Sequence, residues 1–475
     1  MSKLLTSLSV VQAALDVLAR KNGVLGAALC VLDGEDVVTI VTGVASKRTG
    51  VEVTPDTMFQ IGSNTKIYTT TLLMQLVDEG KVDLDAPVRK YVPELKLADP
   101  KAQAIITPRH LLSHSSGIQG DYFEDHGRGD DCIERYVASL AQIGHIHAPG
   151  AMFSYCNSGF TLAGRLIEKV TGLAYHEALQ QRLLGPLGLR STTVLADEML
   201  AHPYAVGHVR AGPRGTLEVP PRVLMARSSA PAGSLTSATP GDVLGFVQLH
   251  LNDGRSPEGT VVLSAHGVRQ MQEPTYRLPG VYDNHVGLGW MLQTWSGERV
   301  LGHTGGTIGQ LSFLQVMPDR PFAVFLATNS ETGAGLWKEL GRWLFAELVG
   351  VEKPGVPRPG DKEPALELSR YVGCYERLTN RCEVTLDGDC LVASVTSEIP
   401  SIDTEPRRQR GRLYAVDATD FYVVLDGTEM LMSFSSFDSE GRPGYLHLGS
   451  RASRRQQGVG DQSVIGGKGK RRDRV

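Results

Sequence analysis

A serine and a lysine stand at a spacing that suits nucleophilic catalysis. Ser63 and Lys66 are three residues apart in FQIGSNTKIYT, where a loop is expected to enter an apolar helix over 67–80. Residues three apart share one face of a helix, so the hydroxyl and the amine can meet. A serine hydroxyl attacks poorly unless a base takes its proton, and a lysine amine is a base only where its surroundings lower its pKa. The alternative is an N-capping serine with a solvated lysine, and Ser-x-x-Lys alone does not decide between them.

A tyrosine and an asparagine form a second candidate pair. Tyr155 and Asn157 flank a cysteine in PGAMFSYCNSGF, at the expected start of a helix over 157–171. A phenol near a nucleophile can relay protons, and an amide can hold a substrate carbonyl. The alternative is a packed tyrosine beside an asparagine that caps the helix, and both roles can coexist at one loop-to-helix junction.

The third motif is HTGG, in RVLGHTGGTIGQLSF. The pattern puts His303 at the end of one strand, just before the next strand of the sheet. A cationic or hydrogen-bonding side chain at this position would face a pocket. The small residues after it, Thr304, Gly305 and Gly306, would let a substrate backbone lie along the strand edge. The alternative is a tight hairpin with an incidental histidine.

The elements around these motifs predict one α/β domain. An N-terminal helix over 1–20 precedes strands over 24–31 and 36–44, and a long helical stretch follows. One sheet built from both ends of this region, with helices packed around it, accommodates that order. Later elements are expected as strands over 287–295, 299–303, 311–317 and 322–329 and a closing helix over 332–350.

Together the three motifs resemble those of the serine β-lactamase, D,D-peptidase and D-aminopeptidase superfamily, whose signatures Ser-x-x-Lys, Tyr-x-Asn and Lys/His-x-Gly occur in this order. Flanking segments resemble it as well: TMFQIGSNTKIYT, ITPRHLLSHSSGI, APAGSLTSA and GHTGGTIG. The resemblance covers residues 5–350. It implies an antiparallel sheet flanked by helices, with an all-helical subdomain.

The resemblance also implies roles for the motif residues. Ser63 would be the acylated nucleophile, Lys66 the base and Tyr155 the proton relay. The expected substrate-binding residues are Asn157, His303, Thr304, Gly305 and Gly306. Backbone N–H groups of Ser63 and Gly306 would form the oxyanion hole. Histidine in place of the lysine of Lys-Thr-Gly is found in the D-aminopeptidase, esterase and peptidyl-cyclase branches, and it argues against efficient β-lactam hydrolysis.

A different pattern begins after residue 350. The segment 351–364, rich in proline and charge, predicts a linker between a domain over 1–350 and one over 365–455, although it could be a surface loop. Seven short strand-like runs between 371 and 449 then predict a small antiparallel β-barrel. The tail 456–475 is glycine-rich and basic, which predicts disorder rather than a nucleic-acid site.

The barrel segment carries its own resemblance. ELSRYVGCYE and YLHLGSRASRR look like parts of the lipocalin-like domain appended to some of these enzymes, including penicillin-binding-protein-type thioesterases. In that branch an arginine near the end of the barrel holds the carboxylate of the acceptor, and Arg451 is the position that aligns with it. The alternative is a surface arginine in an arginine-rich segment.

Composition narrows the possible partners and compartments. A net charge of -4 favours neither nucleic acid nor a membrane surface as a partner. Gln12 and Asp16 interrupt the apolar residues of the first helix, which argues against a signal peptide and favours the cytoplasm. No metal or other cofactor is expected. The side chains weighed and set aside as ligands are Cys374, Cys382 and Cys390, taken as separate buried thiols, His110 and His114, taken as a structural helix end, and His145 and His147, taken as solvated.

The expected function is a serine acyl-enzyme hydrolase or acyltransferase. Its substrates would be peptidyl amides, esters or thioesters with a D-residue at the acyl position, as for a D-aminopeptidase or esterase. One alternative is a penicillin-binding-protein-type thioesterase that cyclises and releases nonribosomal peptides from a carrier protein. Another is a catalytically silent peptide-binding protein of the same fold. The complete set of motif residues favours an enzyme.

Overall fold

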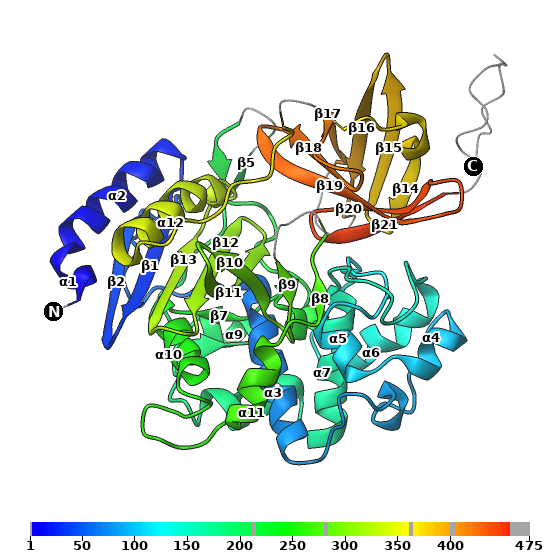
Figure 1. Cartoon of the computed structure of the whole chain (residues 1–475). Helices are drawn as coiled ribbons and strands as arrows, with labels where there is room; N and C mark the ends of the chain where they lie inside the picture. Colours follow the sequence, from blue (N-terminus) through cyan, green and yellow to red (C-terminus); the bar gives the residue numbers. More distant parts are fainter. Residues whose placement is uncertain are drawn as a thin grey trace. The chain divides into compact units, whose positions relative to one another are not determined.

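A sheet and a closed barrel organise the part of the chain that the computed structural model describes (Figure 1). The described residues are 2–210, 212, 215–279, 284–360, 364–399 and 405–456. The chain divides into two compact units between Gly355 and Val356, inside the segment expected to be a linker. The sheet belongs to the first unit and the barrel to the second.

Among the described residues the sheet has eight strands in the order β2-β1-β13-β12-β11-β10-β9-β8, and all of its pairings are antiparallel. Strand β1 pairs with β13, so the sheet joins the two ends of the first unit, as the sequence predicted. The strands are β1 (Gly26–Asp33), β2 (Asp36–Gly43), β8 (Tyr276–Arg277), β9 (His285–Val286), β10 (Met291–Trp295), β11 (Glu298–Thr307), β12 (Gln310–Met317) and β13 (Phe322–Thr328).

Helices cover both faces of this sheet. On one face α2 (Leu8–Lys21) and α12 (Gly333–Val349) lie side by side, and Leu29 of β1 packs in their cluster. On the other face Cys30 packs in the cluster of α3 (Thr65–Asp78) and α10 (Pro240–Leu251). Neighbouring side chains of a strand point to opposite faces, so a strand covered on both sides is apolar throughout.

The helical stretch between the two groups of strands forms the expected all-helical part. Its central helix α7 (Asn157–Thr171) has the predicted bounds and ends at Gly172, whose φ of 72° gives a left-handed C-cap. The helices around it are α4 (Pro100–Ile105), α5 (Pro108–Leu112), α6 (Cys132–Ser139) and α8 (Tyr175–Leu179).

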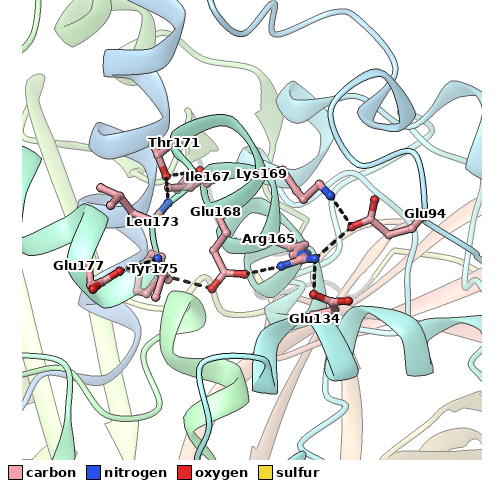
Figure 2. Close-up of polar contacts among 11 residues, drawn as sticks. Glu94, Glu134, Arg165, Ile167, Glu168, Lys169, Thr171, Leu173, Tyr175 and Glu177 are labelled. Carbon is pink, nitrogen blue, oxygen red and sulfur yellow. Dashed lines mark hydrogen bonds and ion pairs between the residues drawn. The ribbon is translucent and has the colours of Figure 1, made fainter.

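A polar network ties α7 to its neighbours (Figure 2). Arg165 forms ion pairs with Glu134 of α6 and, at 3.1 Å, with Glu168 one turn along α7. Glu168 accepts the backbone N–H of Tyr175 at 3.2 Å, and the Tyr175 hydroxyl lies 2.7 Å from Thr69 Oγ1 of α3. Because the Glu168 side chain is largely buried, loss of Arg165 would leave its carboxylate buried without a cationic partner. The network therefore fixes α7 against α3, the helix that begins beside Ser63.

Two elements differ from the sequence-based expectation. The N-terminal helix is split at Ser7 into α1 (Lys3–Thr6) and α2. Strand β11 runs through the HTGG motif to Thr307, so the strand expected to end at His303 continues through the motif. The glycine permits this because a Cβ at Gly305 would lie 2.0 Å from the carbonyl oxygen of Ile61.

The second unit is the predicted antiparallel barrel, closed by pairing of its first and last strands. Its core includes Tyr375, Phe421 and Phe434. The last strand was missed because, in RASRR, only Ala452 is apolar. The barrel strands are β14 (Gly373–Arg377), β15 (Asn380–Asp387), β16 (Cys390–Ser397), β17 (Arg407–Ala415), β18 (Asp420–Leu425), β19 (Thr428–Phe437), β20 (Pro443–Leu448) and β21 (Arg451–Arg455).

Other expectations concern thiols, metals and membranes. The cysteines are free thiols, and in the second unit Cys374 and Cys382 are buried as expected, whereas the expectation is wrong for Cys390, which is only half-buried. Within the described ranges no three His, Cys, Asp or Glu side chains are grouped so that they could hold a metal ion. None of the helices in those ranges is long and apolar enough to cross a membrane. The tail beyond Gln456 lies outside the described residues.

The glycine before Ser63 gives a stability prediction. Gly62 has a φ of 52°, and a Cβ there would lie 2.5 Å from Gly306 N of β11, whereas Gly80 has a φ of 68° with nothing within 4 Å. Both Gly→Ala changes impose backbone strain of roughly 1 kcal/mol. Only Gly62→Ala also forces two backbone segments apart, so it should lower the free energy of unfolding by about 3 kcal/mol or more. Urea unfolding measures both free energies. Equal losses in the two variants would contradict the close approach.

Candidate active site

The amine of Lys66 is held against the hydroxyl of Ser63. Ser63 lies in the short 3₁₀ helix η1 (Gly62–Asn64), directly before α3. Lys66 Nζ donates to Ser63 Oγ at 2.9 Å and to the carbonyl oxygen of Ala232 at 2.6 Å. Lys66 is fully buried, with 0% of its surface exposed. The alternative of a solvated lysine is therefore wrong.

Segments distant in sequence form the backbone around Ser63. Gly233 follows the 3₁₀ helix η5 (Arg227–Ala232), and a Cβ on it would lie 2.1 Å from the carbonyl oxygen of Gly62. From the other side, Asn64 Nδ2 donates to Ser312 Oγ of β12 at 2.8 Å. The turn that carries Ser63 is thus fixed between η5 and the sheet.

Tyr155 lies beside both Lys66 and His303. Lys66 Nζ is 5.0 Å from the centroid of the Tyr155 ring, a distance at which an ammonium is attracted to the ring face. The Tyr155 hydroxyl is 3.5 Å from His303 Nε2. Tyr155 is buried and only 8% exposed. The structure thus brings Ser63, Lys66, Tyr155 and His303 into one chain of contacts.

His303 is a neutral imidazole with a defined tautomer. Its Nδ1 lies 2.7 Å from the carbonyl oxygen of Thr304, and because a carbonyl only accepts, Nδ1 carries the proton. The Nε2 lone pair then faces the Tyr155 hydroxyl, which can donate to it. Burial, followed by the charge of Lys66, lowers the pKa of His303 to about 3. The side chain at position 303 is thus a hydrogen-bonding group in its neutral form, and its role in substrate binding stays a prediction.

The rest of the HTGG motif lies on strand β11, alongside the turn at Ser63. Gly305 is buried, whereas Thr304 and Gly306 on either side of it are exposed. The close approach of Gly306 N to Gly62 puts this N–H next to the residue that precedes Ser63. Two backbone N–H groups near one serine suit the stabilisation of an oxyanion.

Asn157 is the first residue of α7, but it does not cap the helix. The cap is Cys156, whose Sγ accepts the N–H of Gly159 at 3.2 Å, and burial raises the pKa of this thiol. Asn157 Nδ2 instead donates to Asp121 Oδ1 at 3.1 Å. Sequence reasoning missed Asp121, because only packing of Gly120 against the backbone of 155–156 brings it to α7.

The remaining candidate residues lie outside this group of contacts or have surroundings that differ from the expectation. Arg451 is in β21 of the second unit, where its Nη1 donates to the carbonyl oxygen of Gly449 at 3.1 Å, and its role stays a prediction. His147 is buried rather than solvated, and both ring nitrogens of His145 are buried as well, so the expectation of two solvated histidines is wrong. His114, expected only as a helix end, stacks on the Tyr155 ring with 4.2 Å between centroids. The SHSSG sequence could have pointed to His114, but it does not indicate that His114 contacts Tyr155.

The sequence is similar to that of known proteins, and these similarities are consistent with the geometry of the site. A family model described as Beta-lactamase matches residues 11–346. Penicillin-binding protein 4 of Amycolatopsis lactamdurans is 38% identical over 370 residues, which are 76% of this chain and 96% of that protein.

Solved structures extend the similarity to both units. The crystal structure of SurE superposes with a TM-score of 0.78 and 28% identity, over 94% of this chain and 99% of SurE. SurE has also been crystallised with D-Leu. The D-amino acid amidase of Ochrobactrum anthropi SV3 has a TM-score of 0.59 and 26% identity, over 72% of this chain and 97% of the amidase.

The neutral state of His303 gives a prediction about pH and stability. Its pKa falls from 6.5 to about 3 on folding, so between these values the unfolded chain binds a proton that the folded protein does not. Stability is therefore lost as the pH falls below 6.5, with a slope that approaches about 1.4 kcal/mol per pH unit for one proton. In His303→Gln the free energy of unfolding should decline less steeply between neutral pH and pH ~4.5. Identical slopes would mean that His303 titrates normally.

Proposed function

The chain belongs to the Beta-lactamase family and is a serine hydrolase, and we propose that it forms an acyl-enzyme at Ser63 with donors that carry a D-residue at the acyl position. The observation that carries this proposal is the fully buried Lys66 amine, 2.9 Å from Ser63 Oγ. A base within hydrogen-bond reach of the hydroxyl is what a serine nucleophile needs.

In the acylation step Lys66 starts as the neutral amine, so its Nζ lone pair accepts the proton of Ser63 Oγ as that oxygen attacks the acyl carbon. The carbonyl oxygen becomes an oxyanion, and the N–H groups of Ser63 and Gly306 would donate to it. Fixed backbone donors in a largely buried site stabilise this charge without having to reorient. The close packing of η1 against β11 supports this assignment.

Collapse of the tetrahedral intermediate requires a proton on the leaving group. Tyr155 O–H gives its proton to the departing nitrogen, oxygen or sulfur, and Lys66 returns a proton to the phenolate. Water or an amine then attacks the acyl-enzyme, with the same groups working in reverse. The Tyr155 ring beside Lys66 Nζ and its hydroxyl beside His303 Nε2 support this path.

One contact supports binding of an acyl-side amide, and the similar proteins support a D-residue at that position. Asn157 stands at the start of α7, where its amide, oriented by Asp121, can bond an acyl-side amide group. The similar proteins include an amidase named for D-amino acids and SurE, which has been crystallised with D-Leu. Position 303 carries a neutral imidazole rather than a lysine cation, which argues against a β-lactam carboxylate as the preferred ligand.

A second candidate is release and cyclisation of a peptidyl thioester held by a carrier protein. The observation that favours it is the closed barrel, which resembles the domain appended to penicillin-binding-protein-type thioesterases and ends in the strand of Arg451. A guanidinium can bind the carboxylate of an acceptor in two-point fashion. Acyl transfer and hydrolysis share the acyl-enzyme, so the two candidates differ only in the acceptor.

The test of the acyl-enzyme compares D- and L-configured donors. With D-Leu and L-Leu p-nitroanilides, kcat/KM should favour the D-form by roughly 100-fold, because only one configuration lets the acyl carbon reach Ser63. Ser63→Ala should lose turnover by at least about 1,000-fold, whereas Ser139→Ala on α6 should not. Equal rates on the two configurations would remove the stereochemical claim, and an active Ser63→Ala enzyme would remove the nucleophile.

The barrel arginine is tested with a linear peptidyl thioester that ends in a D-residue. Cyclic product lacks only the thiol, and hydrolysed product is heavier than it by one water, so mass spectrometry gives their ratio. Arg451→Ala should lower the cyclic fraction by about 10-fold, as expected for loss of a carboxylate contact. Arg454→Ala, an exposed arginine of the same strand, is the control. Unchanged cyclic product in Arg451→Ala would exclude this arginine from acceptor binding.

A further inference from the structure

His114 contacts Tyr155 and both of its neighbours in the chain. Its carbonyl oxygen accepts the N–H of Ser154 at 2.8 Å, and its Nδ1 accepts the N–H of Cys156 at 2.9 Å. Between these two hydrogen bonds the imidazole stacks on the Tyr155 ring, with 4.2 Å between centroids and 23° between planes. One residue thus restrains the backbone on each side of Tyr155 and the ring itself.

The segment that carries His114 is held in an unusual conformation. His114 has a φ of 56°, in the left-handed region that costs a histidine roughly 1 kcal/mol, and its side chain is fully buried. Gly150 N donates to Ser115 O and Ile146 N to Gly117 O, both at 2.8 Å. These bonds align the loop after α5 with the chain that leads to Tyr155. This backbone conformation directs the imidazole of His114 against the ring of Tyr155.

The hydrogen bonds also define the charge of His114. A backbone N–H only donates, so Nδ1 has no proton and the ring is the neutral Nε2–H tautomer. Protonation at Nδ1 would break the bond to Cys156 N. It would also add a positive charge against the ring that Lys66 Nζ faces at 5.0 Å. The arrangement therefore suits a neutral ring.

We infer that His114 is a positioning residue for Tyr155, which holds the phenol between Lys66 and His303 so that its proton can reach the leaving group. The inference rests on the proposed function, in which Tyr155 relays protons. Displacement of a catalytic group by about 1 Å can cost 100-fold in rate, and His114 bonds both amides that flank Tyr155. The rings of Phe160 and Phe153 also pack against the imidazole of His114.

The inference predicts an effect that depends on the leaving group. When an amide is cleaved, the C–N bond breaks and the departing nitrogen must receive a proton, which comes from Tyr155 O–H. p-Nitrophenolate leaves as a stable anion and needs no proton in that step. A misplaced phenol should therefore slow acylation by amides far more than acylation by p-nitrophenyl esters. Simple loss of folded protein would slow both equally.

The experiment uses two substitutions at His114 and one matched control. His114→Phe keeps an aromatic ring but has no acceptor for Cys156 N–H. His114→Asn keeps an acceptor near the position of Nδ1 and tolerates a positive φ, but it lacks the stacked ring. His250→Asn is the control, since His250 is also buried among aromatic rings and bonds Thr71 but contacts none of the proposed site residues.

Two acylation rates are measured on the full chain. One is kcat/KM for D-Leu p-nitroanilide, and the other is the initial burst of p-nitrophenolate from the matching D-Leu ester. Both are divided by the concentration of Ser63 titrated with a fluorophosphonate. The amide-to-ester ratio should fall about 10- to 100-fold in His114→Phe and roughly 3- to 10-fold in His114→Asn. His250→Asn should lose stability with the ratio unchanged.

Several outcomes would overturn the inference. These are an equal fall of both rates in His114→Phe, a native ratio in His114→Asn, and a ratio in His250→Asn that falls as far as in the His114 variants. If His114→Phe does not fold, His114→Asn decides alone, because loss of the stacked ring predicts a measurable fall. Failure of the proposed function looks different, since the native protein would then not be labelled at Ser63.

Discussion

Burial of the Lys66 amine is the constraint on which the rest of the site depends. The side chain has 0% exposure, and its Nζ donates to Ser63 Oγ and to the carbonyl oxygen of Ala232. A buried amine without such bonds would cost several kcal/mol, so the turn at Ser63 and the end of η5 must both be in place when the protein folds. The same contacts that satisfy the amine put it against the nucleophile.

The groups around Lys66 are arranged so that they add no second positive charge. His303 is neutral because burial and the nearby Lys66 lower its pKa, although its Nδ1 donates to Thr304 O, and the His114 ring is neutral because its Nδ1 accepts the N–H of Cys156. Tyr155 lies between them, with its ring tilted by 51° from that of His303 and stacked on that of His114. Protons can therefore move among Ser63, Lys66 and Tyr155 without competition from a nearby imidazolium.

Sequence reasoning found the parts of the site that depend on local spacing. Ser63 with Lys66, and Tyr155 at the start of α7, follow from residues a few positions apart. It ended the strand at His303, because the approach of Ile61 to Gly305, which lets β11 continue, is a long-range contact. It missed the partners His114 and Asp121 for the same reason, and it missed β21 because Arg451 and its arginine neighbours conceal the alternation of a strand.

The central claim is that Ser63 carries the acyl group during turnover. The most direct measurement is to mix the protein with a D-Leu p-nitrophenyl ester, quench within the burst, and map the adduct by mass spectrometry of proteolytic peptides. A leucyl group is expected on the peptide that contains Ser63, and none is expected after the L-ester is offered under the same conditions. An adduct on another residue, or steady turnover of the D-ester with no adduct at all, would contradict the claim.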